Sequence, residues 1–245
     1  NIEKETIVNS FKFMYPKINS NSTFPQINSK PNIVFLFQES WNAKQMQSYG
    51  FEKQTTPMYD DLLKKSIRPK AMIANGHRTT EGMFASLTSF QNPLGKSIAK
   101  TQLQSFEYSS IIDILSKNNY SSAFFQGSSK ETSGTGSLAN SLGFEYSFGK
   151  RDIKQRKYEE NYWGVHDPDL FNFVKKTVKS TLSEPFVIGI NGATTHDDKV
   201  PKNIKKQTFT EDENINNQLN ALHFSDFALG NFIEDFEEKY PNTIF

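Results

Sequence analysis

The sequence predicts an α/β fold in which a mainly parallel, mixed sheet is covered by helices on both faces. Short apolar runs occur at 33–37, 122–125 and 186–190. Longer segments with apolar residues at helical spacing lie between and after them. This alternation is typical of parallel strands that are joined by helices. In such sheets, functional sites lie beyond the carboxyl ends of the strands.

The first half of the chain supplies one strongly predicted strand and several shorter elements. Residues 33–37 form an unbroken apolar run, which suits a strand buried on both faces. Thr56 and Pro57 predict the start of a helix, as its N-cap and first helical residue. Further along, we expect a short strand at 69–74, helices at 79–90 and 111–115, and a strand at 122–125.

The second half alternates more clearly. We expect a helix at 169–181, a buried strand at 186–190, a polar surface loop at 197–217 and a long amphipathic helix at 217–238. After a turn at Pro241, the stretch 243–245 is apolar and β-branched, which is typical of a strand that begins there.

Length, charge and cysteine content limit the number of domains and exclude several kinds of functional site. The 245 residues suit one large domain, expected at 31–245, with the polar residues 1–30 as a linker or surface arm. A net charge of +1 gives no electrostatic reason to expect a nucleic-acid partner. The absence of cysteine excludes disulfides, thiolate metal sites and a cysteine nucleophile. No apolar run approaches the roughly 20 residues that span a bilayer.

Two segments carry candidate chemistry at the ends of predicted strands. Glu39 follows the first strand, where a carboxylate could bind a hard cation; an exposed loop carboxylate is the simpler alternative from this segment alone. Thr79 follows Gly76 and Arg78 at a predicted helix start, where free N–H groups favour a phosphate. Thr79 needs a metal or a base to act as a nucleophile. Alternatively, Thr79 or Thr80 only caps the helix.

The histidines differ in their expected roles. His196 follows the strand at 186–190 and is placed at the same edge of the sheet, although alone it is an ordinary loop residue. His166 is ambiguous, and His223 is expected to be structural within the long helix.

The order of the motifs along the chain indicates a protein family more specifically than any single motif does. Glu-Ser follows the first strand, and the later segments are Arg-Thr-Thr-Glu-Gly at 78–82, Trp-Gly-Val-His-Asp-Pro-Asp-Leu-Phe at 163–171, Thr-Thr-His at 194–196 and Ser-Asp-Phe-Ala-Leu-Gly-Asn-Phe-Ile at 225–233. This series resembles the sulfatase-like domain of lipoteichoic acid synthases and bacterial phosphoglycerol transferases, within the sulfatase/alkaline phosphatase superfamily. The resemblance covers roughly residues 31–245.

The resemblance implies roles for particular residues. Thr79 would be the nucleophile, with Thr80 as second choice, and Glu39 and Thr79 would bind one divalent metal, Mn²⁺ before Mg²⁺ or Zn²⁺. His196 would bind the substrate phosphate. Arg78 and Lys130 are further candidate phosphate contacts.

Three departures from the family pattern qualify these roles. The family continues after the long helix with a strand that delivers an Asp-His ligand pair, so the domain is expected to be C-terminally incomplete and to bind metal weakly without transferase activity. The stretch 126–136 lacks the aromatic residue and arginine that contact glycerophosphate in lipoteichoic acid synthases, which leaves the substrate open. The Cys/Ser-x-Pro-x-Arg motif of true sulfatases is missing, so sulfate ester hydrolysis is not expected.

The implied function is transfer of a phosphoglycerol group through a phosphothreonine. The donor would be a phospholipid such as phosphatidylglycerol, and the acceptor an envelope glycan or polyglycerolphosphate. Phosphoethanolamine transfer or phosphodiester hydrolysis, and a non-catalytic binding domain, are the alternatives. The resemblance also implies an extracytoplasmic location, with membrane anchoring by segments outside these 245 residues.

Overall fold

The computed structural model describes residues 30–69, 72–93 and 97–245. Pro31–Phe245 form one compact unit, and apart from Lys30 the predicted linker lies outside the described residues. The elements are β1 (Asn32–Phe37), η1 (Ala43–Gln45), η2 (Gln47–Tyr49), α2 (Pro57–Leu63), α3 (Thr79–Thr88), η3 (Gln102–Ser105), α4 (Ile111–Ser116), β2 (Ser121–Gln126), η4 (Thr132–Gly134), α5 (Thr135–Ser141), β3 (Tyr146–Phe148), α6 (Asp167–Thr181), β4 (Phe186–Asn191), η5 (Thr194–His196), α7 (Glu213–Lys239) and β5 (Thr243–Ile244).

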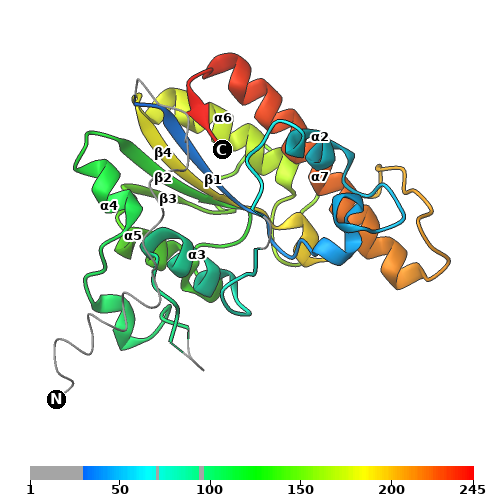
Figure 1. The fold of residues 1–245 in the computed structure, drawn as a ribbon, viewed down its shortest axis with the longest axis horizontal. Helices are drawn as coiled ribbons and strands as arrows, with labels where there is room; N and C mark the ends of the chain where they lie inside the picture. The colour runs from blue at the N-terminus through cyan, green and yellow to red at the C-terminus, as the bar shows by residue number, and fades with distance from the viewer. Residues whose placement is uncertain (1–29, 70–71, 94–96) are drawn as a thin grey trace. The chain divides into compact units, whose positions relative to one another are not determined.

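The described strands form one sheet in the order β3-β2-β4-β1-β5 (Figure 1). Every strand pair in it is parallel, so the α/β prediction is confirmed and the mixed character that we allowed for is not seen. The register sets Phe35 opposite Gly189 and Phe125 opposite Ile190. Because the strands run parallel, the residues that follow β1, β2 and β4 meet at one edge of the sheet.

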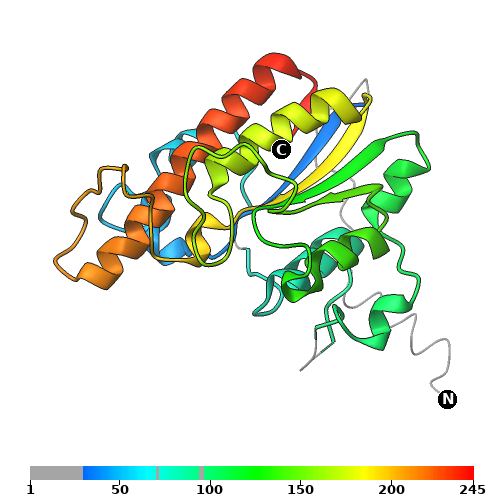
Figure 2. The ribbon, with the colours of Figure 1, turned by 180° about the vertical axis from the view of Figure 1, so that it is seen from behind.

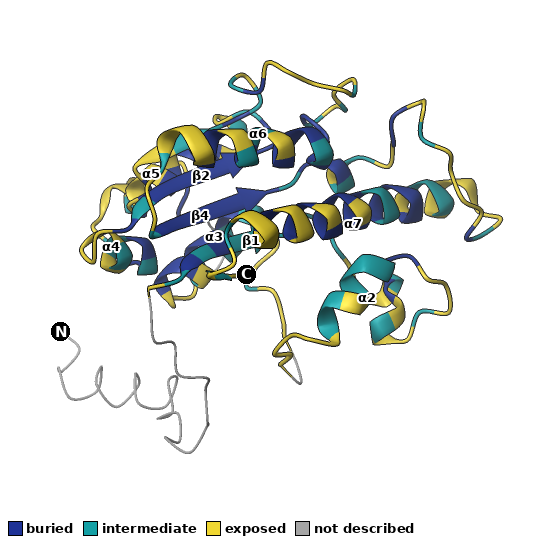
Figure 3. Ribbon diagram, turned by 90° about the horizontal axis from the view of Figure 1, so that it is seen from above, coloured by how far each residue is buried: buried dark blue, intermediate teal, exposed yellow. Residues whose placement is uncertain are grey.

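Helices cover both faces of the sheet, as Figures 1 and 2 show. On one face α6 and α7 pack over the strands; the buried residues there include Val34, Phe125, Leu170, Val174, Ile188, Leu229 and Phe232. On the other face lie α3, α4 and α5, around a second cluster that includes Met83, Phe84, Ile112, Phe124, Leu138 and Val187. Figure 3 shows β2 and β4 buried between these layers. Burial on both faces explains why these strands are apolar runs rather than alternating ones.

The long helix α7 also anchors the segment that follows β1. Its Asp226, which is fully buried, accepts hydrogen bonds from the backbone N–H groups of Met58 (2.9 Å) and Tyr59 (2.8 Å), at the start of α2. Gly230, one turn further along α7, leaves room for Met58: a Cβ there would lie 2.5 Å from the Met58 methyl carbon. Helix α2 is therefore fixed against α7 at its N-terminal end.

The structure corrects a predicted strand and the end of a predicted loop, and it contains a helix and a strand that were not predicted. The loop expected at 197–217 is shorter, because α7 begins at Glu213 with Asp212 as its N-cap. The strand expected at 69–74 is wrong for the residues that are described, because residues 69 and 72–74 are irregular, and Met72 and Ile73 are 87% and 91% exposed. A strand needs a neighbour for its backbone groups, and apolar content alone does not supply one. Helix α5 and strand β3 were not predicted, since α5 is short and polar and β3 has three residues.

The expected strand start after Pro241 is confirmed by β5, in which Thr243 pairs with Asn32 of β1. None of the described helices has the length and apolar character needed to cross a membrane.

Candidate functional site

Glu39 and Thr79 meet at the carboxyl end of the sheet. Glu39 lies two residues beyond the end of β1, and Thr79 is the first residue of α3. The Thr79 hydroxyl donates a hydrogen bond to Glu39 Oε2 over 2.6 Å, and both residues are partly buried. The expected proximity of the two side chains is therefore confirmed, although they are 40 residues apart in the chain. A carboxylate at this distance holds the hydroxyl group in one orientation, with its hydrogen directed at Glu39.

The turn before α3 is held in place by Glu81. Its Oε2 accepts hydrogen bonds from the backbone N–H groups of His77 (2.7 Å) and Arg78 (3.3 Å). Gly76 makes this possible: its φ is +96°, and a Cβ there would lie 2.1 Å from Glu81 Oε2. The amides of Thr79 and Thr80, in the first turn of α3, have no acceptor within the helix and carry its positive dipole end.

The segment after β4 reaches the same place. Thr195, in η5, donates its hydroxyl hydrogen to the backbone carbonyl of Glu39. The next residue, His196, is exposed, and its ring stacks on Trp163 with centroids 4.0 Å apart and planes inclined by 4°. His196 thus lies beside the Glu39 loop, with its imidazole held by an aromatic face.

Asp167 holds the segment between β4 and η5 in place through hydrogen bonds. Its buried carboxylate accepts hydrogen bonds from the amides of Ala193 (2.9 Å) and Thr194 (3.2 Å) and from the Ser225 hydroxyl (2.5 Å). The Thr194 hydroxyl in turn accepts the Asp167 N–H over 2.8 Å. Asp167 therefore has a positioning role for η5, which carries His196.

His166, which was ambiguous from the sequence, and His223, which was expected to be structural, both lie in packed surroundings. His166 is 3% exposed, lies against Tyr158 and Phe224, and has no partner for Nδ1 among the described residues. Burial lowers its pKa, and the nearby Asp167 and other carboxylates offset this only in part. His223 uses both ring nitrogens, one toward the Thr55 carbonyl and one toward the Gln207 amide, as expected of a structural residue.

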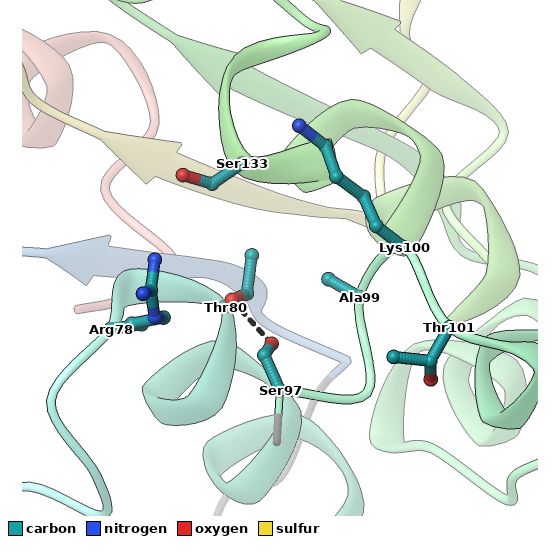
Figure 4. Close-up of a pocket in the computed structure, with 7 residues that line it drawn as sticks. All are labelled: Arg78, Thr80, Ser97, Ala99, Lys100, Thr101 and Ser133. Carbon is teal, nitrogen blue, oxygen red and sulfur yellow. Dashed lines mark hydrogen bonds between the residues drawn. The ribbon is translucent and has the colours of Figure 1, made fainter. Parts of the chain in front are cut away.

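A cavity of about 370 Å³ opens beside the start of α3 (Figure 4). Its walls combine two cations with several hydroxyl groups; they are Arg78, Thr80, Ser97, Ala99, Lys100, Thr101 and Ser133. The hydroxyl groups of Thr80 and Ser97 share a hydrogen bond of 2.8 Å. Since Thr80 is 1% exposed and bonded to Ser97, its hydroxyl does not face Glu39 as that of Thr79 does.

Lys130 is directed elsewhere. Its ammonium lies 3.5 Å from Asp152 Oδ2 and donates to the Ser147 carbonyl over 3.2 Å. Lys130 does not line the cavity, and its ion pair with Asp152 partly neutralises the ammonium charge. Among the candidate phosphate contacts, Arg78 directly precedes Thr79 in the chain, and His196 follows Thr195, which bonds the Glu39 carbonyl. Lys130 is held in a separate contact.

Several residues of this region could not be predicted from sequence patterns. Lys100 and Ser133 come from irregular segments without periodicity, so nothing indicated that both would reach the Thr80 wall. Trp163 belongs to a motif that we singled out, but its contact with His196 depends on the tertiary fold.

Glu39 and Thr79 are the right kind of ligand for a divalent metal ion, but they are too few to complete its coordination sphere. Glu39 and Thr79 offer oxygen atoms, which hard divalent cations prefer. Within the part of the chain that the structure describes, no group of three or more His, Cys, Asp or Glu side chains is arranged to hold a metal ion. These residues could therefore supply part of a coordination sphere.

With this geometry in view, the sequence profile of the sulfatase family matches residues 31–245. The chain belongs to the sulfatase family. Among curated proteins, this sulfatase-family chain is similar to the lipoteichoic acid synthase-like protein YvgJ of Bacillus subtilis, with 23% identity over 223 residues. That match covers 87% of the chain and 35% of YvgJ, so the chain spans about a third of this relative.

Solved structures share the fold of this sulfatase-family domain. An alkaline phosphatase superfamily protein from Vibrio parahaemolyticus matches with a TM-score of 0.84 at 21% identity, over 99% of this chain and 62% of that one. The lipoteichoic acid synthase LtaP from Listeria monocytogenes gives 0.76 at 16% identity, over 88% and 54%. The phosphoglycerol transferase GacH from Streptococcus pyogenes, solved with sn-glycerol-1-phosphate, gives 0.61 at 15% identity, over 96% and 64%. These likenesses confirm the expected fold, and the match to the sulfatase family confirms the expected superfamily.

Proposed function

We propose that this domain is the catalytic part of a metal-dependent phosphotransferase that moves a phosphoglycerol-type group through a phosphothreonine at Thr79. The observation that carries the proposal is the hydrogen bond of 2.6 Å from the Thr79 hydroxyl to Glu39, at the N-terminus of α3. A nucleophilic oxygen, an oriented carboxylate and free helix amides converge there. The similarity to GacH, a phosphoglycerol transferase, supports phosphoglycerol as the transferred group. The similarity to YvgJ and LtaP supports a reaction of the lipoteichoic acid synthase type.

The chain's own groups suit the two half-reactions. In the first, Thr79 Oγ1 would form a bond to the phosphorus of the donor diester while the bond from phosphorus to the lipid alcohol breaks. The hydroxyl proton is already directed at the Glu39 carboxylate. In the second, an acceptor hydroxyl would take the phosphoglycerol group and release Thr79. The amides of the first α3 turn, Arg78 and His196 would stabilise the phosphoryl oxygens.

A divalent metal completes the proposal, with Mn²⁺ preferred to Mg²⁺ or Zn²⁺. Glu39 and Thr79 would be two of its oxygen ligands. When bound there, such an ion would stabilise the negative charge of the threonine oxygen and of the phosphoryl group.

The partners follow from the same proposal. The donor would be a phospholipid such as phosphatidylglycerol, and the acceptor an envelope glycan or a polyglycerolphosphate chain. Such substrates imply an extracytoplasmic domain held at the membrane by other parts of the protein.

The test is mass spectrometry of Thr79 in the full-length protein that contains this domain. After incubation with phosphatidylglycerol and Mn²⁺, we expect a glycerophosphoryl adduct on Thr79. Thr79→Ala should remove the adduct and the transfer activity, while Thr80→Ala should keep both. The Thr79 substitution should lower the free energy of unfolding by only about 1 kcal/mol, since one partly exposed hydrogen bond is lost.

The same experiment separates the alternatives. An adduct formed only from phosphatidylethanolamine would point to phosphoethanolamine transfer, and release of free glycerophosphate without an acceptor would indicate a hydrolase. Absence of any adduct, with metal bound, would support a non-catalytic binding domain. An adduct on Thr80 would move the nucleophile by one residue.

A further inference from the structure

A groove along α6 has no part in the transfer steps described above. It is formed by two cavities that α6 shares with α7 and with the loop before α6, and we call it the α6 groove. We propose that the α6 groove binds an uncharged oligosaccharide, with sugar rings packed on its aromatic side chains and sugar hydroxyl groups bound by its carboxamides. This proposal goes beyond the transfer reaction and does not depend on Thr79.

The two cavities of the α6 groove adjoin at Asn172, which lines both. One has a volume of about 290 Å³ and lies between α6 and α7, which pack side by side on one face of the sheet (Figure 2). The other has a volume of about 280 Å³ and lies between α6 and residues 152–155 of the preceding loop. Two adjoining cavities of similar size suit a ligand made of linked units.

Aromatic side chains line the larger cavity. Phe171 and Phe232 are buried there and stack with ring centroids 4.5 Å apart. Phe227 is 42% exposed, and the partly exposed rings of Tyr158 and Phe224 meet edge to face at 5.5 Å. Exposed aromatic groups with a polar rim mark binding surfaces. One face of a sugar ring carries mainly C–H groups, which leave water when they pack on such rings.

The wall that carries Tyr158 is fixed by the start of α6. Asp169, which is 3% exposed, accepts hydrogen bonds from the backbone N–H groups of Lys157 and Tyr158, both over 2.9 Å. The Tyr158 ring also contacts the buried ring of His166, with centroids 6.4 Å apart. A wall that is formed before binding lowers the conformational entropy that a ligand has to overcome.

Most charged groups of the α6 groove already have partners. Lys175 of α6 forms an ion pair with Asp235 of α7. The Lys176 ammonium donates a hydrogen bond to the Gln155 side-chain oxygen over 2.6 Å, and Asp152 is paired with a lysine outside the groove. Each cavity also contains carboxylates, which would repel an anion. The groove therefore complements an uncharged ligand.

Asn172 and Asn231 supply the polar contacts for such a ligand. Both are exposed and line the larger cavity, and their side-chain amides make no hydrogen bond to any described residue. A carboxamide can donate through its nitrogen and accept through its oxygen, so it can bind two neighbouring hydroxyl groups. Apolar walls with a few polar groups are typical of ligand sites, and this combination favours a sugar over a lipid chain or an anionic polymer.

The test is saturation-transfer NMR on the full-length protein that contains this domain, in a detergent without sugar groups. The neutral probes are cellotetraose, maltotetraose and tetra-N-acetylchitotetraose, each with its monosaccharide, and tetragalacturonate is the acidic probe. We expect at least one neutral tetrasaccharide to bind about fivefold or more tightly than its monosaccharide, because linked rings occupy both cavities. Tetragalacturonate should bind more weakly than that tetrasaccharide.

Variants locate the bound sugar. Phe227→Ala and Asn231→Ala should each weaken tetrasaccharide binding by about fivefold or more, and both replace exposed side chains of α7 with a residue that favours helix. Phe106→Ala removes an exposed phenylalanine outside the groove and is the matched control, with no effect expected. Thr79→Ala should bind the tetrasaccharide as the wild type does.

The remaining outcomes overturn the proposal. They are the absence of binding by every neutral tetrasaccharide, and equal binding by the wild type and both groove variants. An equal loss in Phe106→Ala would show non-specific contact with surface aromatic groups, and tighter binding of tetragalacturonate would show an anion site. A loss in Thr79→Ala would place the sugar at the transfer site. Because no turnover is measured, sugar binding and adduct formation on Thr79 can each succeed or fail without the other.

Discussion

Asp226 shows how one buried side chain links stability to pH. It is 0% exposed, and burial raises its pKa from 3.8 to about 6. The two amide hydrogen bonds from Met58 and Tyr59 act in the opposite direction, because they stabilise the carboxylate, while the nearby charge of Asp60 raises the pKa further. The folded protein therefore binds the Asp226 proton more tightly than the unfolded chain does.

The sign of the effect follows from this difference. Asp226 contributes stability that is fully present below its unfolded pKa and is lost as the pH rises through about 6. Asp226→Asn cannot ionise and lacks this dependence. We expect the stability of the wild type relative to the variant to fall by about 2 kcal/mol between pH 4 and pH 7.5, as urea unfolding at both values would show. A difference between the two proteins that is constant across this range would contradict the raised pKa.

At the scale of the element, the start of α3 depends on a glycine before it. The Glu81 carboxylate fills the space beside Gly76 and accepts the amide hydrogens of the turn. Because Thr79 is the first residue of this helix, a displaced turn would also displace its hydroxyl from Glu39.

Gly76→Ala tests this dependence, with Gly50→Ala as its matched control. Both glycines have a φ near +100°, but a Cβ at Gly50 would meet nothing within 4 Å, whereas at Gly76 it would displace Glu81. We expect Gly50→Ala to lower the free energy of unfolding by about 1 kcal/mol, from φ alone. Gly76→Ala should lower it by about 2–3 kcal/mol, because hydrogen bonds of the turn are lost as well.

Activity gives a second measurement for this pair. Adduct formation at Thr79 should decrease strongly in Gly76→Ala and remain near wild type in Gly50→Ala. Similar losses of stability and activity in the two variants would show that the Glu81 contact does not organise the site.

At the scale of the whole molecule, the question is how much of a metal site the 245 residues supply. The described structure brings together Glu39 and Thr79, and it contains no larger group of His, Cys, Asp and Glu side chains suited to a metal ion. A hard divalent cation takes about six oxygen ligands, so water would have to fill most of its positions.

We therefore expect these 245 residues alone to bind Mn²⁺ weakly, with a dissociation constant in the millimolar range or above, and to show no measurable transfer. Calorimetric titration of Mn²⁺ into the chain, with Glu39→Gln for comparison, checks this expectation. Tight binding at one ion per chain, or binding that does not depend on Glu39, would mean that another set of ligands exists.

The amino-acid sequence by itself determined the layers of this protein. The apolar runs that became β2 and β4 are buried on both faces, whereas the run that became β1 is only partly buried. The periodic segments that became α6 and α7 cover one face of the sheet. The order of the motifs was enough to indicate the sulfatase superfamily and to place Glu39 and Thr79 at the same edge of the sheet. These features are local patterns, or follow from the rule that parallel strands end together.

Tertiary structure alone decided the contacts between segments far apart in the chain. Apolar content suggested a strand at 69–74, but no partner is present for the described part of it, and a strand exists only when its backbone groups are paired. Three features have no counterpart in the sequence pattern: the ion pair of Lys130 with Asp152, the stacking of His196 on Trp163, and the shared cavity that Arg78 and Lys100 line. Each depends on how loops pack in three dimensions, where spacing along the chain carries no information.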